Sequence, residues 1–127
     1  LGRQVCTVLD ALRAAGAPAL LAGDLNSLPP GDDPRRLGNA AVLYADAETP
    51  IQPLYDALDV VFPRETPAYT YVPWGSNRPD RTIDYLFGTG VEVLESEVLT
   101  EGARWSDHLP IRTVIRIPEP SAVSLQL

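Results

Sequence analysis

The chain has 127 residues and a formal net charge of −7, and 45% of its residues are hydrophobic and 21% charged. This length and composition indicate one globular domain with a substantial core, and no apolar run approaches the roughly 18 residues that a membrane-spanning helix needs. The acidic balance argues against a protein that tracks nonspecifically along nucleic acid, although metal ions can supply positive charge for a phosphorylated substrate. The single cysteine excludes an internal disulfide.

The first half of the chain predicts a helix, a buried strand, a loop and a second helix. Apolar residues recur at helical spacing over 3–15, and the apolar run 19–23 has the character of a buried strand. Proline, glycine and aspartate mark 26–53 as mostly loop, with a short helical turn near 33–37. Helical spacing returns over 53–61. A helix followed by a short turn into an apolar strand indicates an α/β fold.

The second half of the chain changes to strand character. Short β-rich runs, bounded by glycine, proline and polar residues, predict strands over 68–72, 82–87, 91–100 and 111–117. The short connections between them favour antiparallel pairing. The prolines at 118 and 120 and the small polar residues after them predict a flexible tail over 119–127, after a domain that occupies 1–118.

Polar residues follow the first predicted strand, in the sequence Gly-Asp-Leu-Asn at 23–26. Strand alternation predicts that Asp24 and Asn26 project from the same face, and Gly23 allows a ligand or another backbone to approach closely. A strand that delivers a carboxylate and a carboxamide to its carboxyl end is typical of an α/β binding site. The alternative interpretation is that the two residues only start a turn.

A second cluster combines Asp84 and His108. Asp84 lies within an apolar strand between Ile83 and Tyr85, where a carboxylate is costly unless it is paired. Its natural partner is the single histidine of the chain, since a buried aspartate that holds an imidazole fixes its tautomer and raises its basicity. Asp107, next to that histidine, is placed to bind a hard cation through oxygen.

Each of these motifs also has a purely structural explanation. A histidine followed by Leu-Pro can be a loop residue, and Ser-Asp can cap a helix or a turn. The three motifs together, in this order and spacing, favour a catalytic site over a set of unrelated turns.

The three motifs resemble those of the endonuclease/exonuclease/phosphatase superfamily, the DNase I-like metal-dependent phosphoesterases. The family pattern Gly-Asp-[Phe/Leu]-Asn matches 23–26, and its Ser-Asp-His-x-Pro pattern matches 106–110. Its Arg-[Ile/Leu]-Asp-Tyr-[Ile/Leu]-Phe pattern matches 81–87 with one extra residue, Thr82. The resemblance covers about 3–117, which is nearly the whole chain.

This resemblance implies a phosphodiester hydrolase that uses Mg²⁺ or Mn²⁺ and an attacking water. By it, Asp24 orients or deprotonates the water and Asn26 holds the water and the phosphate oxygens. His108 contacts the scissile phosphate, with Asp84 as its orienting partner, and Asp107 assists metal binding. The chemistry agrees with the residues, because phosphodiester hydrolysis needs an in-line water, a cation and donors for the developing charge.

The substrate class stays open among a nucleic acid, a phospholipid head group and a small phosphoester. Trp74, Asn77 and Arg81 are candidate substrate-binding residues, since they can stack on a base or hold a phosphate. The alternative for Trp74 is simple packing beside a proline. The acidic balance favours a small phosphodiester or a phospholipid head group over duplex DNA.

The chain also departs from the family pattern. Family members carry an Asn and a metal-binding Glu upstream of the Gly-Asp-Leu-Asn strand, whereas only 23 residues precede Asp24 here and none of them is Glu. The sequence does not begin with Met. We therefore expect the C-terminal half of a DNase I-like four-layer α/β sandwich, with one mostly antiparallel mixed sheet and helices on one face. We expect this fragment to need its N-terminal half, and to be inactive alone.

Two other hypotheses belong to different classes. The first is a noncatalytic fragment that self-associates as a homodimer through its exposed sheet face. The second is a degenerate family member with a noncatalytic role. The joint presence of the candidate catalytic and metal-binding side chains argues against the second, because no structural role requires all of them together.

Overall fold

The computed structural model describes residues 2–45, 50–65 and 67–119. Its elements in chain order are α1 (Gly2–Ala15), β1 (Ala19–Asp24), the 3₁₀ helix η1 (Pro34–Tyr44), α2 (Gln52–Ala57), β2 (Asp59–Phe62), β3 (Asp84–Thr89), β4 (Glu92–Val98), the 3₁₀ helix η2 (Thr100–Arg104) and β5 (Ile111–Arg116). Within these ranges, no helix has the length and apolar character needed to cross a bilayer.

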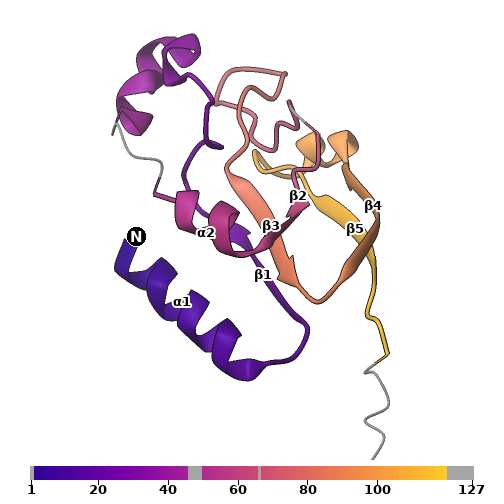
Figure 1. The fold of residues 1–127 in the computed structure, drawn as a ribbon. Coiled ribbons are helices and arrows are strands. Elements are labelled where there is room, and N and C mark those ends of the chain that lie inside the picture. Colours follow the sequence, from indigo (N-terminus) through magenta and orange to yellow (C-terminus); the bar gives the residue numbers. More distant parts are fainter. Residues whose placement is uncertain (1, 46–49, 66, 120–127) are drawn as a thin grey trace, which may run out of the picture.

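The helices α1 and α2 cover one face of a three-stranded antiparallel sheet with the order β1-β3-β2 (Figure 1). Alternate residues of β3, Tyr85 and Phe87, point into this layer and are 2% and 0% exposed. Val5 and Leu9, one helical turn apart on α1, pack with them, and Leu54 of α2 completes the contact. The core therefore forms where the period of a helix and the period of a strand each present one apolar face.

The remaining strands, β4 and β5, pair antiparallel in a separate two-stranded sheet. The sequence predicts one mixed sheet, so the structure corrects this detail. The reason is that β3 already pairs with β1 on one edge and with β2 on the other. Although β4 follows β3 closely, no free edge of β3 is left for it. The α/β class, the antiparallel pairing and the helices on one face are confirmed.

Most of the predicted elements are confirmed, and two are wrong. The predicted helix over 53–61 ends at Ala57, since the residues after it leave the helix and pair with the edge of β3. The predicted strand over 68–72 forms no ladder, and only Tyr71 makes bridges. The helical turn expected near 33–37 is longer, as η1. A flexible tail is predicted from Glu119 onward, and residues 120–127 of it lie outside the described part of the chain.

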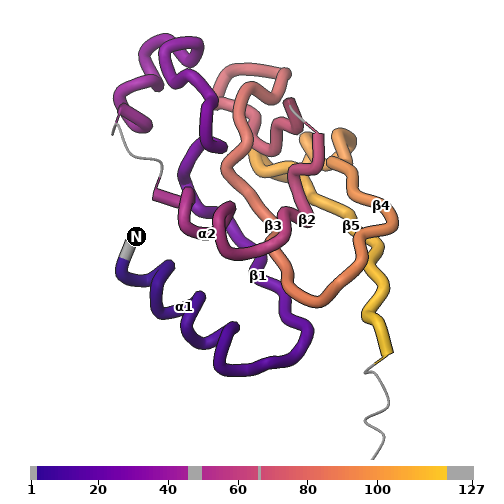
Figure 2. Tube along the Cα trace, in the orientation of Figure 1, coloured from indigo at the N-terminus to yellow at the C-terminus, as the bar shows by residue number. Residues whose placement is uncertain are grey.

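The antiparallel topology brings several loops to one end of the sheets. β1 runs toward this end, and β3 and β5 both start there, so the segment after β1 and the segments before β3 and β5 gather together (Figure 2). These are the segments that carry the three sequence motifs. The fold therefore assembles in space the polar clusters that the chain separates by dozens of residues.

Candidate functional site

Two carboxylates face each other at the end of the first sheet. Asp24 is the last residue of β1, Asp84 is the first residue of β3, and the register pairs them directly across the two strands. Directly opposed residues lie on the same face, and like charges there repel unless a cation or a donor lies near them. The sequence alone placed each carboxylate in a motif, but the pairing of the two is a product of the register.

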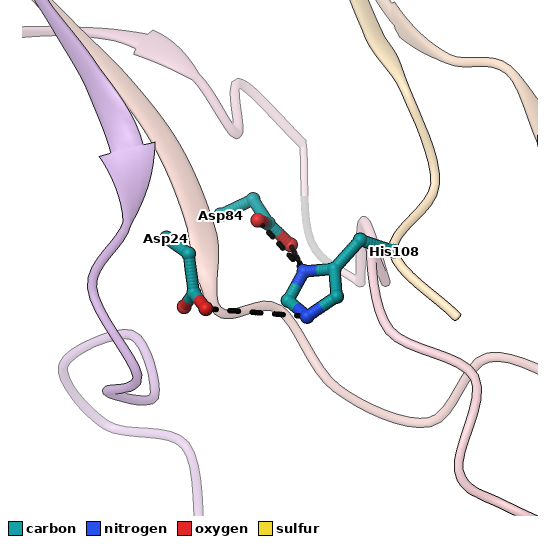
Figure 3. Close-up of side chains that lie close together, drawn as sticks. All are labelled: Asp24, Asp84 and His108. Atoms are coloured by element: carbon teal, nitrogen blue, oxygen red, sulfur yellow. Dashed lines mark hydrogen bonds and ion pairs between the residues drawn. The ribbon is translucent and has the colours of Figure 1, made fainter. Parts of the chain in front are cut away.

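The imidazole of His108 reaches both carboxylates (Figure 3). Its Nδ1 lies 3.0 and 3.1 Å from the two oxygens of Asp84, and its Nε2 lies 3.9 Å from Oδ2 of Asp24. Asp84 is the more buried carboxylate, with a side chain 17% exposed against 37% for Asp24. Because an ionised carboxylate only accepts, Nδ1 carries the donated proton, which leaves Nε2 directed toward Asp24 and the solvent.

Backbone hydrogen bonds hold the histidine loop against the start of β3. Tyr71 bridges to Arg81 on one side and to His108 on the other. The amide of Val72 donates to the Asp107 carbonyl at 2.8 Å, and the amide of Leu109 donates to the carbonyl of the residue before Tyr71 at 2.7 Å. The segment around Tyr71 is therefore the physical link between Asp84 and His108.

Side chains of the same segment reinforce this link. The hydroxyl of Thr70 is fully buried and accepts from the amides of Ile83 and Asp84, at 3.2 and 3.3 Å. The ring of Tyr71 meets the imidazole edge-on, with centroids 5.2 Å apart. Sequence reasoning missed both residues as contributors to the site. The available signal was a threonine within an otherwise apolar β-rich run.

Asn26 lies just beyond the end of β1, in a turn closed by Asp24. Its amide donates to Asp24 Oδ1 at 2.8 Å, and its side-chain Nδ2 lies 3.3 Å from Oδ2. Its φ of 47° is left-handed, a conformation that asparagine tolerates better than most residues. The predicted shared strand face does not form, because the strand ends at Asp24. The turn weighed as the alternative is present, and it places the carboxamide against the carboxylate.

The other predicted site residues lie further out. Trp74 and Asn77 are exposed, and so is Asp107, whose side chain has no hydrogen-bond partner among the described residues. Arg81 is buried, and its Nε donates to Asp80 Oδ1 at 2.6 Å. That hydrogen bond is the main cause that raises the pKa of Arg81 above its ordinary value. Its guanidinium also lies over the ring of Tyr71, 5.0 Å from the centroid.

Comparison with known proteins decides the family. The model of the endonuclease/exonuclease/phosphatase family matches residues 5–108. The chain belongs to the endonuclease/exonuclease/phosphatase family. The matched range includes Asp24, Asn26, Asp84 and His108. No curated protein and no solved structure matches the chain.

Membership in the endonuclease/exonuclease/phosphatase family gives the cluster a chemical context, since this is a hydrolase family that acts on phosphoester bonds and is generally metal-dependent. One ligand atom from each of Asp24, Asp84 and His108 lies within 4.8 Å of the other two. Oxygens on opposite sides of a Mg²⁺ ion are about 4.2 Å apart, so the cluster is close to the size of a divalent cation site. The two opposed carboxylates fit such an ion in charge and donor type, and the imidazole lies beside them as a hydrogen-bond donor to Asp84.

A groove of about 400 Å³ runs from this cluster between the β1-β3-β2 sheet and the β4-β5 sheet of this chain. Asp24 and Asp84 lie at one part of its wall, and Leu86, Leu109 and Ile111 line it further on. Beyond the carboxylates, the groove is therefore lined mainly by apolar side chains. A substrate group or a protein segment of matching shape can enter this groove beside the carboxylates.

Proposed function

We propose that this chain carries the metal-assisted phosphodiesterase site of its family, in which water attacks a phosphodiester. The observation that supports this most strongly is the pair of opposed carboxylates, Asp24 and Asp84, with His108 in reach of both. Two opposed carboxylates repel each other and Asp84 is partly buried, so the arrangement costs free energy. A reaction that needs a base, an oriented donor and a cation explains it.

In this proposal, each side chain has a separate task. Asp84 accepts the Nδ1–H of His108 and so orients the ring, with Nε2 turned toward Asp24. The 3.9 Å between Nε2 and Asp24 Oδ2 is too long for a hydrogen bond. The oxygen of a water molecule can, however, lie within hydrogen-bond distance of both atoms. In the proposed step, the water oxygen bonds to phosphorus as Asp24 takes a proton from the water, and the bond from phosphorus to the leaving oxygen breaks. Protonated His108 donates a hydrogen bond from Nε2 to a phosphate oxygen.

Asn26 and the cation complete the proposed site. The Nδ2 of Asn26 is held next to Asp24, where it can also donate to the water or to a phosphate oxygen. We propose Mg²⁺ or Mn²⁺ as the cation, held by the carboxylates of Asp24 and Asp84. When bound, it supplies charge neutralisation at the phosphate and the leaving oxygen. Asp107 is proposed as a further ligand, because it is adjacent to His108 and its exposed carboxylate is not engaged by any described residue.

We further propose that a second polypeptide segment, equivalent to the N-terminal half of the family fold, covers the groove and contributes a metal-binding glutamate. The support is that the groove is lined by apolar side chains right beside the carboxylates, and that the described cluster contains two carboxylates and no glutamate. By this proposal, the 127-residue chain binds metal weakly and hydrolyses little without that segment. A phosphodiester-containing molecule is the substrate in either case.

The test uses Mn²⁺, which broadens the NMR signals of nearby protons. The chain has one histidine, so its ring signals report on this site alone. We expect Mn²⁺ to broaden them selectively, and Asp24→Asn to abolish the effect. Asp59→Asn, which changes an exposed carboxylate of β2, is the matched control and should behave as the parent chain does. Equal broadening in both variants would contradict the metal site.

A second readout is cleavage of bis(p-nitrophenyl) phosphate by the chain combined with the N-terminal half of a family member. We expect metal-dependent cleavage that falls by about 10²–10⁴-fold in His108→Ala, the usual range for loss of a general acid or base. Cleavage that survives this change unaltered would contradict the role of His108. A homodimer in solution that binds no Mn²⁺ would instead favour the noncatalytic, self-associating fragment.

A further inference from the structure

The two tryptophans of the chain are its most exposed large apolar side chains in the described ranges. Trp74 is 101% exposed and Trp105 is 88% exposed. Single exposed apolar residues are common and carry no meaning by themselves. Indoles are large, however, and two left in full contact with solvent forgo a substantial hydrophobic gain.

The backbone brings both tryptophans to the rim of the candidate site. Trp74 follows Val72 by two residues and Trp105 precedes Asp107 by two residues, and the amide of Val72 donates to the Asp107 carbonyl at 2.8 Å. The adjacent bridge of this antiparallel pair joins Tyr71 to His108. Both tryptophans therefore extend from the same hydrogen-bonded pair of segments that holds the imidazole.

Each tryptophan is carried by an ordered turn. The turn at Trp74 is closed by the amide of Ser76 donating to the Pro73 carbonyl at 2.9 Å. Trp105 caps η2, where its own amide donates to the Gly102 carbonyl at 2.9 Å. Because the backbone of each turn is held by these hydrogen bonds, only the side-chain torsions of the ring remain to be ordered when a ligand stacks on it.

Unpaired arginines accompany the two rings. Arg78 lies in the same loop as Trp74, and Arg104 directly precedes Trp105. Within the described ranges, the guanidinium groups of these two and of Arg3 contact no carboxylate and no hydrogen-bond acceptor. The other arginines each contact a carboxylate or a backbone carbonyl. Two of the three arginines without such a contact therefore lie next to the tryptophans in sequence.

We propose that Trp74 and Trp105, with Arg78 and Arg104, form a subsite for unpaired nucleobases and their phosphates, so that the substrate class is single-stranded nucleic acid. This inference rests on the proposed phosphodiesterase function and deepens it. Aromatic rings stack on bases of any sequence, and guanidinium groups contact the phosphates between them. A duplex keeps its bases stacked inside and does not offer them to these rings.

The chemistry around the rings favours a nucleobase over a lipid surface. A helix or loop that enters a bilayer needs a continuous apolar face. Here Trp74 follows Pro73 and is followed by Gly75, Ser76 and Asn77, and Trp105 lies between Arg104 and Ser106. Isolated rings among polar groups match a stacking platform, in which only the base contacts an apolar surface.

The test uses the intrinsic fluorescence of the chain, since it contains no other tryptophans. A single-stranded hexanucleotide is titrated without metal, so that no cleavage occurs. We expect saturable quenching, and a dissociation constant about 5–150-fold larger in Trp74→Ala and in Trp105→Ala, from about 1–3 kcal/mol per stacked base. Leu43→Ala, at an apolar residue of η1 that is 72% exposed, is the matched control and should bind as the parent chain does.

The arginines are tested by salt dependence. The plot of the logarithm of the binding constant against the logarithm of the salt concentration has a negative slope. Arg78→Gln combined with Arg104→Gln should reduce the magnitude of this slope by about 1.4, because each phosphate contact on a single strand contributes about 0.7. Arg3→Gln, at the third unpaired arginine on α1, should leave the slope unchanged. Equal effects of Arg3→Gln and of the double variant would overturn the assignment of phosphate contacts to the rim.

Three results would overturn the subsite as a whole. The first is that the hexanucleotide does not quench the tryptophan emission. The second is that an abasic hexamer with the same phosphates binds equally well. The third is that phosphatidylcholine vesicles shift the tryptophan emission to the blue while the oligonucleotide does not bind. The measurement needs no metal, so it is independent of the Mn²⁺ test. Mn²⁺ binding without base stacking would refute only this inference, and base stacking without Mn²⁺ binding would refute only the proposed reaction.

Discussion

Two neighbouring tyrosines in the core should respond in opposite directions to the same substitution. The hydroxyl of Tyr55 is buried and has no hydrogen-bond partner among the described residues. The hydroxyl of Tyr85 donates to the Ser27 carbonyl at 2.6 Å and lies 3.2 Å from the Thr82 carbonyl. The two rings are 6.3 Å apart in the same cluster. Tyr55→Phe and Tyr85→Phe therefore remove the same atom from two neighbouring rings, one without a hydrogen-bond partner and one with a partner.

The expected magnitudes follow from the hydrogen bonds. An unsatisfied buried hydroxyl costs about 1–3 kcal/mol, so Tyr55→Phe should raise the free energy of unfolding by about 1 kcal/mol after a small void is allowed for. That gain corresponds to a Tm about 4 °C higher for a domain of this size. Tyr85→Phe loses a hydrogen bond and leaves the Ser27 carbonyl without this donor, so it should lower the free energy of unfolding by about 2 kcal/mol.

Urea unfolding followed by far-UV circular dichroism is the suitable assay. Tryptophan emission is not, because both indoles are already exposed in the folded chain and change little on unfolding. The reasoning is refuted if Tyr55→Phe is destabilising by more than about 1 kcal/mol, or if the two variants move in the same direction. Ser27 follows Asn26, so Tyr85→Phe also tests whether this hydrogen bond steadies the turn next to Asp24.

Three further predictions concern pH, packing and the histidine. Burial raises the pKa of Tyr55 from 10.0 to about 12, so this tyrosine loses its proton at a lower pH in the unfolded chain than in the folded one. The free energy of unfolding, measured by alkaline denaturation, should therefore fall as the pH rises from about 10 to 12. An added Cβ on Gly102 would lie 2.2 Å from Cδ of Pro110, so Gly102→Ala should lower the free energy of unfolding in urea by about 1–3 kcal/mol. Asp84→Ala removes the acceptor at Nδ1 of His108, so the ¹⁵N shifts of the ring should report a changed tautomer.

Each of these has a matched control. Tyr55→Phe should reduce the loss of stability between pH 10 and 12 but not remove it, because burial also raises the pKa of Tyr85, and an unchanged profile would contradict the assignment. Gly23→Ala should be tolerated sterically, because an added Cβ there meets nothing within 4 Å, and a loss as large as that at Gly102 would speak against the packing argument. Asp59→Ala should leave the ¹⁵N shifts of the histidine in place, whereas identical spectra for Asp84→Ala would exclude the hydrogen bond.

The sequence by itself determined the features that depend on local chemistry. The helical spacing of Val5 and Leu9 requires α1, and the apolar run before Asp24 requires β1. The motifs around Asp24, Asp84 and His108 identify the family, because their residue types and order are rare by chance. The pairing of Asp84 with His108 followed from the cost of a carboxylate in an apolar strand and from the single histidine of the chain.

Only the tertiary structure decided the features that depend on distant segments. The register placed Asp24 opposite Asp84, and the two occupied edges of β3 left β4 and β5 to form their own sheet. The role of Tyr71 as the link to the histidine appeared only when three segments came together. A sequence records which groups are present, whereas the burial, pairing and exposure of those groups depend on contacts with parts of the chain that no local pattern describes.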